Sequence, residues 1–257
     1  MKNDNGNKFL FTIAVLLLAC LVCMVFIKIF IFDKKKEDRP KEVSEDVIKE
    51  VYSYLDITPL NNEITFYANQ FIKSNNLSYQ TLAKATYNYI VNYDKFKLEA
   101  TTDEDQKLID KGTLIYKIKT EVFIEETSKI FENPTLTLNE HFNTFDIDEE
   151  TSAKVINDYV YIYKLNDKIN NNYITYRGML SYTLTDNNDT IIITEYYLGC
   201  DKETRKCYDT FGTQNTPNSI TYSENLDAST MTPKLKKYEH TFKKIDGNYK
   251  WVSVEGV

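Results

Sequence analysis

The chain has 257 residues, with 31 basic and 38 acidic side chains and a formal net charge of −7. Residues 1–41 hold eight of the basic and four of the acidic side chains, so residues 42–257 carry a charge of about −11. Such a charge repels phosphate backbones, and nucleic-acid binding lacks its usual electrostatic basis. The aromatic content of 14% argues against intrinsic disorder.

Residues 9–32 are predicted to be a transmembrane anchor, preceded by a short tail at residues 1–8. The stretch 9–27 contains no charge, and nineteen helical residues span about 28 Å, close to the roughly 30 Å hydrocarbon core of a bilayer. Residues 17–20 resemble a bacterial lipobox, and a cleaved signal peptide is a second alternative. The apolar run continues to Phe32 with no small-x-small cleavage site after it, which favours a retained anchor.

A charged linker is expected at residues 33–42, because this stretch has no large apolar residue. Basic residues are more numerous on the C-terminal side of the anchor than on the N-terminal side, which would place the rest of the chain in the cytoplasm. However, long domains translocate largely regardless of charge, and a close cysteine pair suits an oxidising compartment. We expect a single-pass protein of the cell membrane with residues 43–257 outside, and the cytoplasmic alternative stays open.

Amphipathic helices are predicted in most of residues 43–132. Ser44 can cap a first helix that ends before Pro59, and Ser78 can cap a third helix. The inward positions of the first helix recur at helical spacing at Val47, Ile48, Val51, Tyr52 and Leu55. Those of the third helix are Leu82, Ala85, Tyr89, Ile90 and Tyr93. A second helix is expected from the same spacing at Ile64, Tyr67, Ala68, Phe71 and Ile72, ending at Asn75.

Residues 113–118 are predicted to be extended, and a fourth helix begins near Thr120 and ends before Asn133 and Pro134. Its buried positions are expected to be Phe123, Ile124, Thr127, Ile130 and Phe131. Residues 135–158 have no clear period. Their acidic run at 146–150 is expected to begin a short helix.

Strands dominate the prediction for residues 159–257, because Tyr, Ile, Thr and Val are frequent there and turn residues separate the runs. The expected strands are 159–164, 173–185, 190–198, 234–245 and 248–254. Residues 186–189 form a hairpin loop, and Asp246 and Gly247 a two-residue turn. The expected fold is α+β: a transmembrane helix, then amphipathic helices, then a mostly antiparallel sheet with the helices on one face.

Cys200 and Cys207 are predicted to form a structural disulfide, since they enclose six polar residues between two strands. Two free thiols are the main alternative. A zinc site would need two more ligands, and a redox pair usually has two intervening residues. Cys20 and Cys23 lie in the anchor and serve as small apolar residues.

No catalytic, cofactor-binding or metal-binding residue is predicted. The two histidines, His141 and His240, have no metal-ligand spacing, and His240 shares a strand face with Tyr238 and Phe242, which is more typical of packing or of a surface position than of chemistry. The acidic stretches 146–150 and 186–189 lack the glycine and distal glutamate of an EF-hand loop. The sequence also lacks a phosphate-binding loop and a Gly-x-Ser-x-Gly motif.

These observations predict a membrane-tethered, non-enzymatic extracytoplasmic domain that binds a protein or a cell-envelope component. It would contact membrane lipid through the anchor and would not bind nucleic acid. The alternative is an extracytoplasmic carboxylate-dependent hydrolase acting on envelope glycans or peptides. A hydrolase would need a cleft holding two close carboxylates with raised pKa, which a binding domain does not require.

Overall fold

The computed structural model describes residues 43–57, 60, 66, 71–139, 143–204, 206–208, 220–221 and 235–257. All of them belong to one compact unit, Val43–Val257. The predicted anchor, the charged linker and His141 lie outside the described residues. Among the helices that are described, none has the length and apolar character to cross a bilayer.

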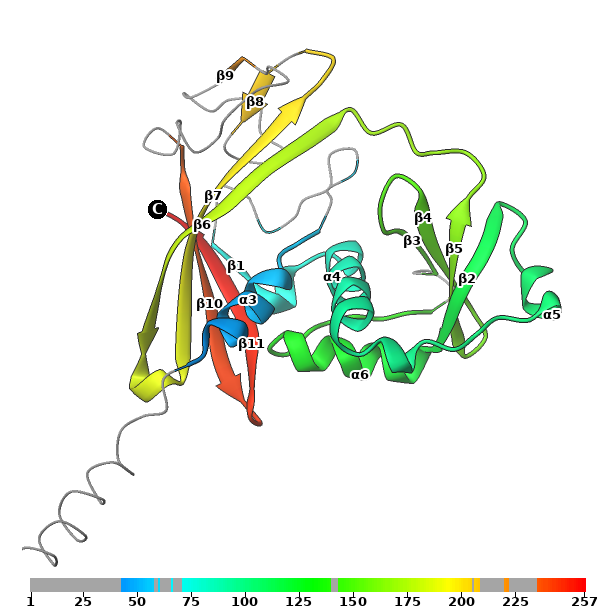
Figure 1. Cartoon of the computed structure of the whole chain (residues 1–257), viewed down its shortest axis with the longest axis horizontal. Coiled ribbons are helices and arrows are strands. Elements are labelled where there is room, and N and C mark those ends of the chain that lie inside the picture. The colour runs from blue at the N-terminus through cyan, green and yellow to red at the C-terminus, as the bar shows by residue number, and fades with distance from the viewer. Residues whose placement is uncertain are drawn as a thin grey trace, which may run out of the picture. The chain divides into compact units, whose positions relative to one another are not determined.

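Two antiparallel sheets make up most of the described structure (Figure 1). The larger sheet has the order β1 (Ile72–Lys73), β11 (Asn248–Gly256), β10 (Lys237–Ile245), β7 (Thr190–Asp201), β8 (Lys206–Tyr208) and β9 (Ile220–Thr221), with β6 (Tyr173–Thr185) also paired to β7. The smaller sheet has the order β2 (Gly112–Lys119), β5 (Tyr159–Leu165), β4 (Thr151–Ile156) and β3 (Thr144–Asp146). Because β6 pairs with β7 along its whole length, β10 and β8 share the opposite side of β7.

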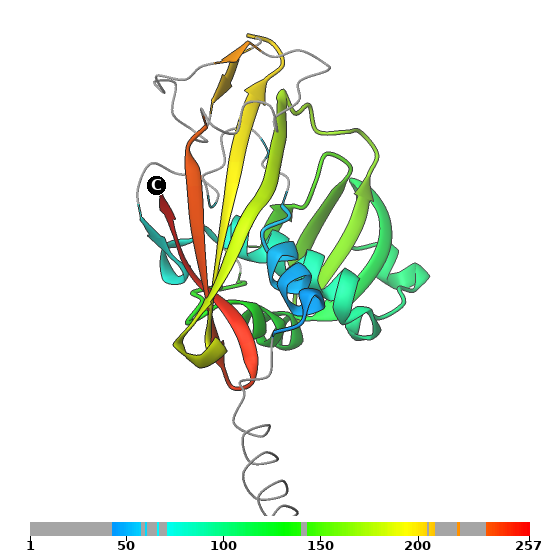
Figure 2. The ribbon, with the colours of Figure 1, turned by 60° about the vertical axis from the view of Figure 1, so that its left-hand side comes forward.

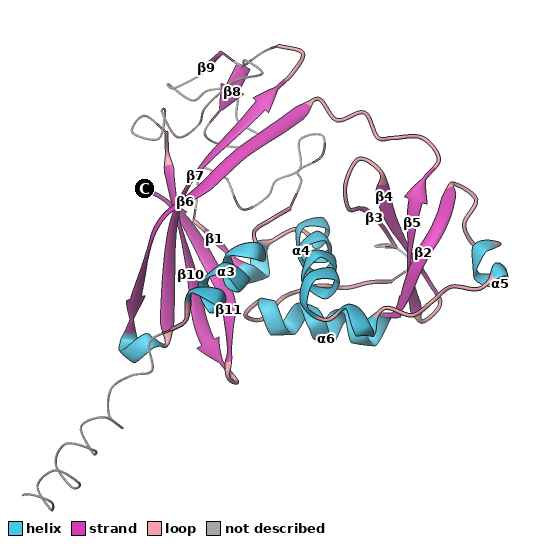
Figure 3. Ribbon diagram, in the orientation of Figure 1, coloured by secondary structure: helices cyan, strands magenta, loops and turns pink. Residues whose placement is uncertain are grey.

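The main helices lie between the two sheets (Figures 1 and 3). The α-helices are α3 (Glu45–Ser53), α4 (Tyr79–Tyr93), α5 (Asp103–Gln106) and α6 (Thr120–Ile130), and the 3-10 turns are η2 (Ser74–Asn76), η3 (Lys95–Lys97) and η4 (Asp186–Asn188). Helix α6 packs on α4 and contacts β11 of the larger sheet and β2 and β5 of the smaller one. The predicted α+β class is confirmed, but the helices are covered by a sheet on each side and not packed on one face of a single sheet.

Local capping explains why α3 and α4 begin where the sequence predicts. The Ser44 hydroxyl accepts a hydrogen bond from the backbone N–H of Val47, and the Ser78 hydroxyl accepts one from Thr81. Each cap satisfies one of the amides that a helix leaves unpaired at its start. The inward position predicted for Tyr93 is wrong, since its side chain is exposed and lies 3.1 Å from the Ser53 hydroxyl.

The second predicted helix falls mostly on residues outside the described part of the chain. Its expected end is wrong, because Ile72 belongs to strand β1 and pairs with Val254 near the end of the chain. A two-residue strand leaves no periodicity in the sequence, and its partner lies far away along the chain. The pairing is therefore a tertiary feature that local spacing does not contain.

Both predicted hairpins of the C-terminal half are confirmed. Strands β10 and β11 are joined by Asp246 and Gly247, whose φ angles are 54° and 89°. Positive φ at both central residues gives the turn twist that matches paired strands, and Asp and Gly tolerate it. Strands β6 and β7 are likewise joined across residues 186–189, where Asn187 and Asn188 have positive φ.

The acidic run at residues 146–150 does not begin a helix, so this prediction is wrong. It forms the turn between β3 and β4, in which Asp148 accepts a hydrogen bond from the backbone N–H of Glu150 at 2.7 Å. Asp146 accepts another from the Ser152 hydroxyl at 2.6 Å. Short acidic side chains bond readily to nearby groups in this way, which competes with helix formation.

Trp251 lies at the centre of a core that helices and strands of both sheets share. Its ring is fully buried, with the rings of Phe66 and Phe131 at centroid distances of 5.0 and 5.9 Å. Phe131 follows α6, and Trp251 lies on β11. The aromatic contacts therefore hold α6 against the larger sheet, and edge-on ring pairs of this kind add to the stabilisation from burial.

Candidate functional site

A buried polar cluster in the larger sheet is the most concentrated ionisable chemistry in the described residues. We call it the Glu195 cluster; it comprises Glu195 on β7, His240 on β10, Arg177 on β6, Tyr52 on α3 and Trp251 on β11. Glu195 and His240 have no solvent exposure. They lie on the same face as the apolar core residues of their strands, because side chains alternate along a strand.

Each oxygen of the Glu195 carboxylate faces donors. Oε2 accepts hydrogen bonds from the Tyr52 hydroxyl at 2.8 Å and from Nε of Arg177 at 3.1 Å. Oε1 lies 2.9 Å from Nε2 of His240. The Arg177 guanidinium also lies over the Tyr52 ring, 4.4 Å from its centroid, which adds a cation–π contact.

Trp251 determines which nitrogen of His240 carries the proton. Its indole N–H donates to Nδ1 of His240 at 3.2 Å, so Nδ1 must be an acceptor and the proton of the neutral ring lies on Nε2, facing Glu195. Burial lowers the pKa of His240, and this outweighs the opposing effect of Glu195. The neutral imidazole leaves Glu195 and Arg177 as the charged pair, and their charges cancel.

Tyr52 is held in its protonated form. Burial raises the pKa of Tyr52 above its usual range, and Glu195 raises it further while Arg177 opposes the shift. The phenol therefore remains a donor to Glu195 at physiological pH. This bond joins α3 to the larger sheet across 143 positions of sequence.

A histidine oriented by a carboxylate can act as a general base, but the Glu195 cluster is not accessible to a substrate. Both side chains are fully buried, and neither of the two surface depressions found among the described residues is lined by a member of the cluster. Proton transfer to a substrate needs approach to within hydrogen-bond distance. The geometry therefore supports a structural role, which agrees with the packing interpretation of His240.

A second group of charges joins α4 to α6. The Lys129 ammonium lies 2.7 Å from Glu126 and 3.0 Å from Asp94, and Glu126 is fully buried. Burial raises the pKa of Glu126. Burial would also raise the pKa of Asp94, but hydrogen bonds with Glu126 and Lys129 lower it overall. The two carboxylates are close, but Lys129 bonds to both and neither described depression includes them, so the cleft of a hydrolase is not found here.

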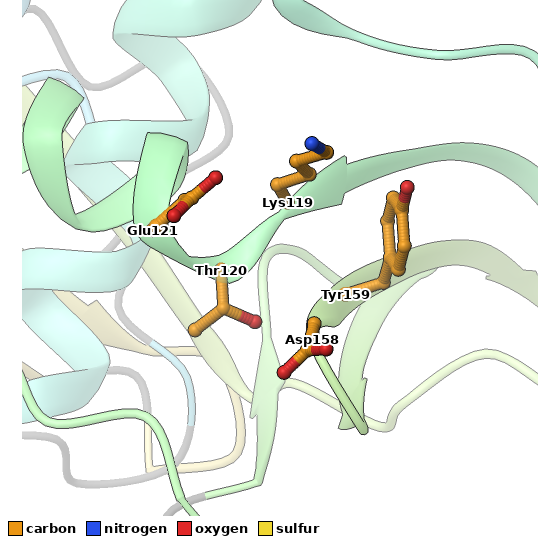
Figure 4. A pocket seen from close by; sticks show the side chains of 5 residues that line it. All are labelled: Lys119, Thr120, Glu121, Asp158 and Tyr159. Carbon is orange, nitrogen blue, oxygen red and sulfur yellow. The ribbon is translucent and has the colours of Figure 1, made fainter.

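One surface depression lies where β2 meets α6, beside the turn between β4 and β5 (Figure 4). It has a volume of about 360 Å³ and is lined by Lys119, Thr120, Glu121, Asp158 and Tyr159. The Lys119 and Tyr159 side chains point the same way, whereas Thr120 and Asp158 point away from them (Figure 4). Because the polar groups do not converge and their charges are mixed, the depression lacks the geometry of a specific anion or cation site.

The other depression, of about 440 Å³, includes the acidic turn at residues 148–150. Glu150 forms ion pairs with Lys164 and Lys168, which lower its pKa. No group of three or more metal-ligating side chains occurs among the described residues. The turn at residues 186–189 joins β6 to β7, and its Asp189 carbonyl accepts a hydrogen bond from the backbone N–H of Lys244 on β10.

The structure joins Cys200 and Cys207 in a disulfide with an S–S distance of 2.06 Å. The two residues are direct partners across β7 and β8, so the bond lies within a strand pair. Both are fully buried in a small apolar cluster with Leu198 and Leu235. Closing so short a loop stabilises a fold by about 2 to 3 kcal/mol in the chain-entropy description.

Comparisons with known proteins do not identify this chain: no protein-family model, curated protein or solved structure matches it. Sequence reasoning placed His240 on a strand, in a packing or surface position, but did not identify Glu195, Arg177 or Tyr52 as its neighbours. A signal was present, because Glu195 continues the alternating apolar positions Ile191 and Ile193 and precedes Tyr197. A carboxylate on the buried face of a strand requires donors from elsewhere in the fold.

We expect substitution of Glu195 by glutamine to destabilise the protein by about 3 kcal/mol, because removing one partner of a buried ion pair leaves the other charge uncompensated. Urea denaturation followed by circular dichroism measures the loss. Glu255→Gln is the matched control, since Glu255 is exposed on β11, and it should change stability by less than about 0.5 kcal/mol. Equal effects of the two substitutions would contradict the assignment.

The lowered pKa of His240 predicts a pH dependence of stability. In the unfolded chain the imidazole binds a proton when the pH is below its ordinary pKa of 6.5, whereas the buried ring in the folded protein binds it only at a lower pH. The contribution of His240 is therefore complete above pH 6.5 and is lost as the pH falls from there through the lower, folded pKa. The free energy of unfolding, measured by denaturation between pH 8 and 5, should show this decline in His141→Gln, which keeps His240. The decline should be absent from His240→Gln. An imidazole that titrates near 6.5 by NMR in the folded protein would contradict it.

Proposed function

We propose that the chain is a membrane-tethered extracytoplasmic domain that binds a protein or a component of the cell envelope. The apolar segment at residues 9–32 supports the tether, since its uncharged part is long enough to span a bilayer. The Cys200–Cys207 disulfide carries the assignment to the outer side, because the cytoplasm keeps such thiols reduced.

Binding is favoured over catalysis by where the ionisable side chains lie. In the described residues, the histidine, the fully buried glutamates and their basic partners serve contacts between secondary-structure elements. The close carboxylates Asp94 and Glu126 are the feature that would favour a hydrolase. However, catalysis requires access to both carboxylates, and Glu126 is fully buried between α4 and α6, where Lys129 bonds to both.

The test is retention on isolated cell envelopes. Full-length chain in lipid nanodiscs is mixed with envelopes from cells that lack it, and the material that sediments is measured. We expect saturable retention that excess unlabelled chain displaces, and none for empty nanodiscs. Retention no greater than that of empty nanodiscs would contradict binding. Release of soluble glycan or peptide fragments during the incubation would favour the hydrolase.

A further inference from the structure

Strand β6 forms an open margin of the larger sheet. Among the described strands, residues 179–185 of β6 pair only with β7 (Figures 1 and 2). Residues 179–183 are all exposed, whereas β7 beside them alternates between buried and partly exposed positions. Both faces of this half of β6 therefore reach solvent, together with the unpaired amide and carbonyl groups of an edge strand.

The sequence of this edge lacks the usual protection against pairing. Residues 179–185 contain no charged residue and no proline, which are the devices that commonly block an edge strand. Met179, Leu180 and Tyr182 are each about 40% exposed. An irregularity of register between Met179 and Ser181 interrupts the strand once, but residues 181–185 pair with β7 without a further shift of register.

Charge identifies the occupant of this edge. Residues 42–257 carry about −11, so a basic partner would be drawn to the carboxylates, none of which lies on residues 179–185. Two copies of the chain repel each other over most of their surfaces, and an uncharged strand is where they can approach without that repulsion. Two antiparallel copies of one strand also form a self-complementary contact with two-fold symmetry.

We propose that residues 181–185 of two copies pair edge to edge, so that the larger sheets of both copies become one continuous sheet. The contact consists of backbone hydrogen bonds between strands, with Leu180 and Tyr182 flanking it on the exposed faces. A single short strand pair is a small interface, so confinement of both copies to one membrane raises their effective concentration. This last step alone rests on the proposed tether.

The test is a cysteine scan of the full chain in native membranes. Cys20 and Cys23 are replaced by alanine, single cysteines are placed in turn at positions 181 to 185, and mild oxidation is followed by non-reducing electrophoresis. Antiparallel pairing of identical strands brings only the position at the two-fold axis opposite itself. We expect covalent dimer to peak at one position, severalfold above its neighbours, whereas random collision gives equal yields at all five.

A charge on the edge provides the matched control. Tyr182→Lys, or Thr183→Lys where the scan peaks at position 182 itself, should abolish the cross-link at the peak position, because it sets two like charges near each other across the paired strands. Tyr93→Lys should leave the yield unchanged, since Tyr93 is equally exposed, at 42% against 41%, but lies on α4. Equal yields along the scan, insensitivity to the lysine on β6, or cross-links to a different protein in place of the second copy would each overturn the proposal.

The outcome is separable from that of the proposed function. If the chain washes off membranes in high salt, the tether is wrong, and the same scan on concentrated purified chain still tests the edge. A peak at the same position there supports pairing without the tether. A flat scan on chain that stays in the membrane overturns the pairing and leaves the tether intact.

Discussion

The carboxylate of Glu195 is the constraint on which the arrangement of the larger sheet depends. A fully buried charge is tolerated only when its oxygens are surrounded by donors, and here the donors come from α3, β6 and β10. Trp251 of β11 fixes the histidine in turn. One side chain thus determines how a helix and four strands meet, and an apolar residue at this position would not impose the same geometry.

The buried polar side chains of the domain stabilise contacts between its helices and strands. The buried glutamates Glu195 and Glu126, with their basic partners, hold α3 to the larger sheet and α4 to α6. In the described part of the chain, the surface contributes two depressions without converging groups, together with the open edge of β6.

The elements that the sequence predicted share a local cause. Ser78 caps α4, Asp246 and Gly247 adopt the positive φ of a tight hairpin, and the alternation of β7 appears in its own residues. What the sequence did not contain were long-range pairings: β1 with β11, the separate sheet of β2 to β5, and the donors of Glu195. The acidic run at residues 146–150 had the composition of a helix start, but its side chains bond to the turn itself. The helix-start composition was overridden there by the hairpin that joins β3 to β4.

The most direct test of a disulfide-closed domain on the outer side of the membrane is thiol labelling in intact cells. The chain, with Cys20 and Cys23 replaced by alanine and with Glu255→Cys, is treated in intact cells with a membrane-impermeant maleimide, and a second maleimide is then applied to the denatured protein with and without reductant. Glu255 is exposed whereas Cys200 and Cys207 are buried, so we expect the first label at position 255, and the second label at Cys200 and Cys207 only after reduction and not in Cys200→Ser/Cys207→Ser. Labelling of position 255 that requires permeabilised cells, or labelling of Cys200 and Cys207 that needs no reductant, would contradict the account.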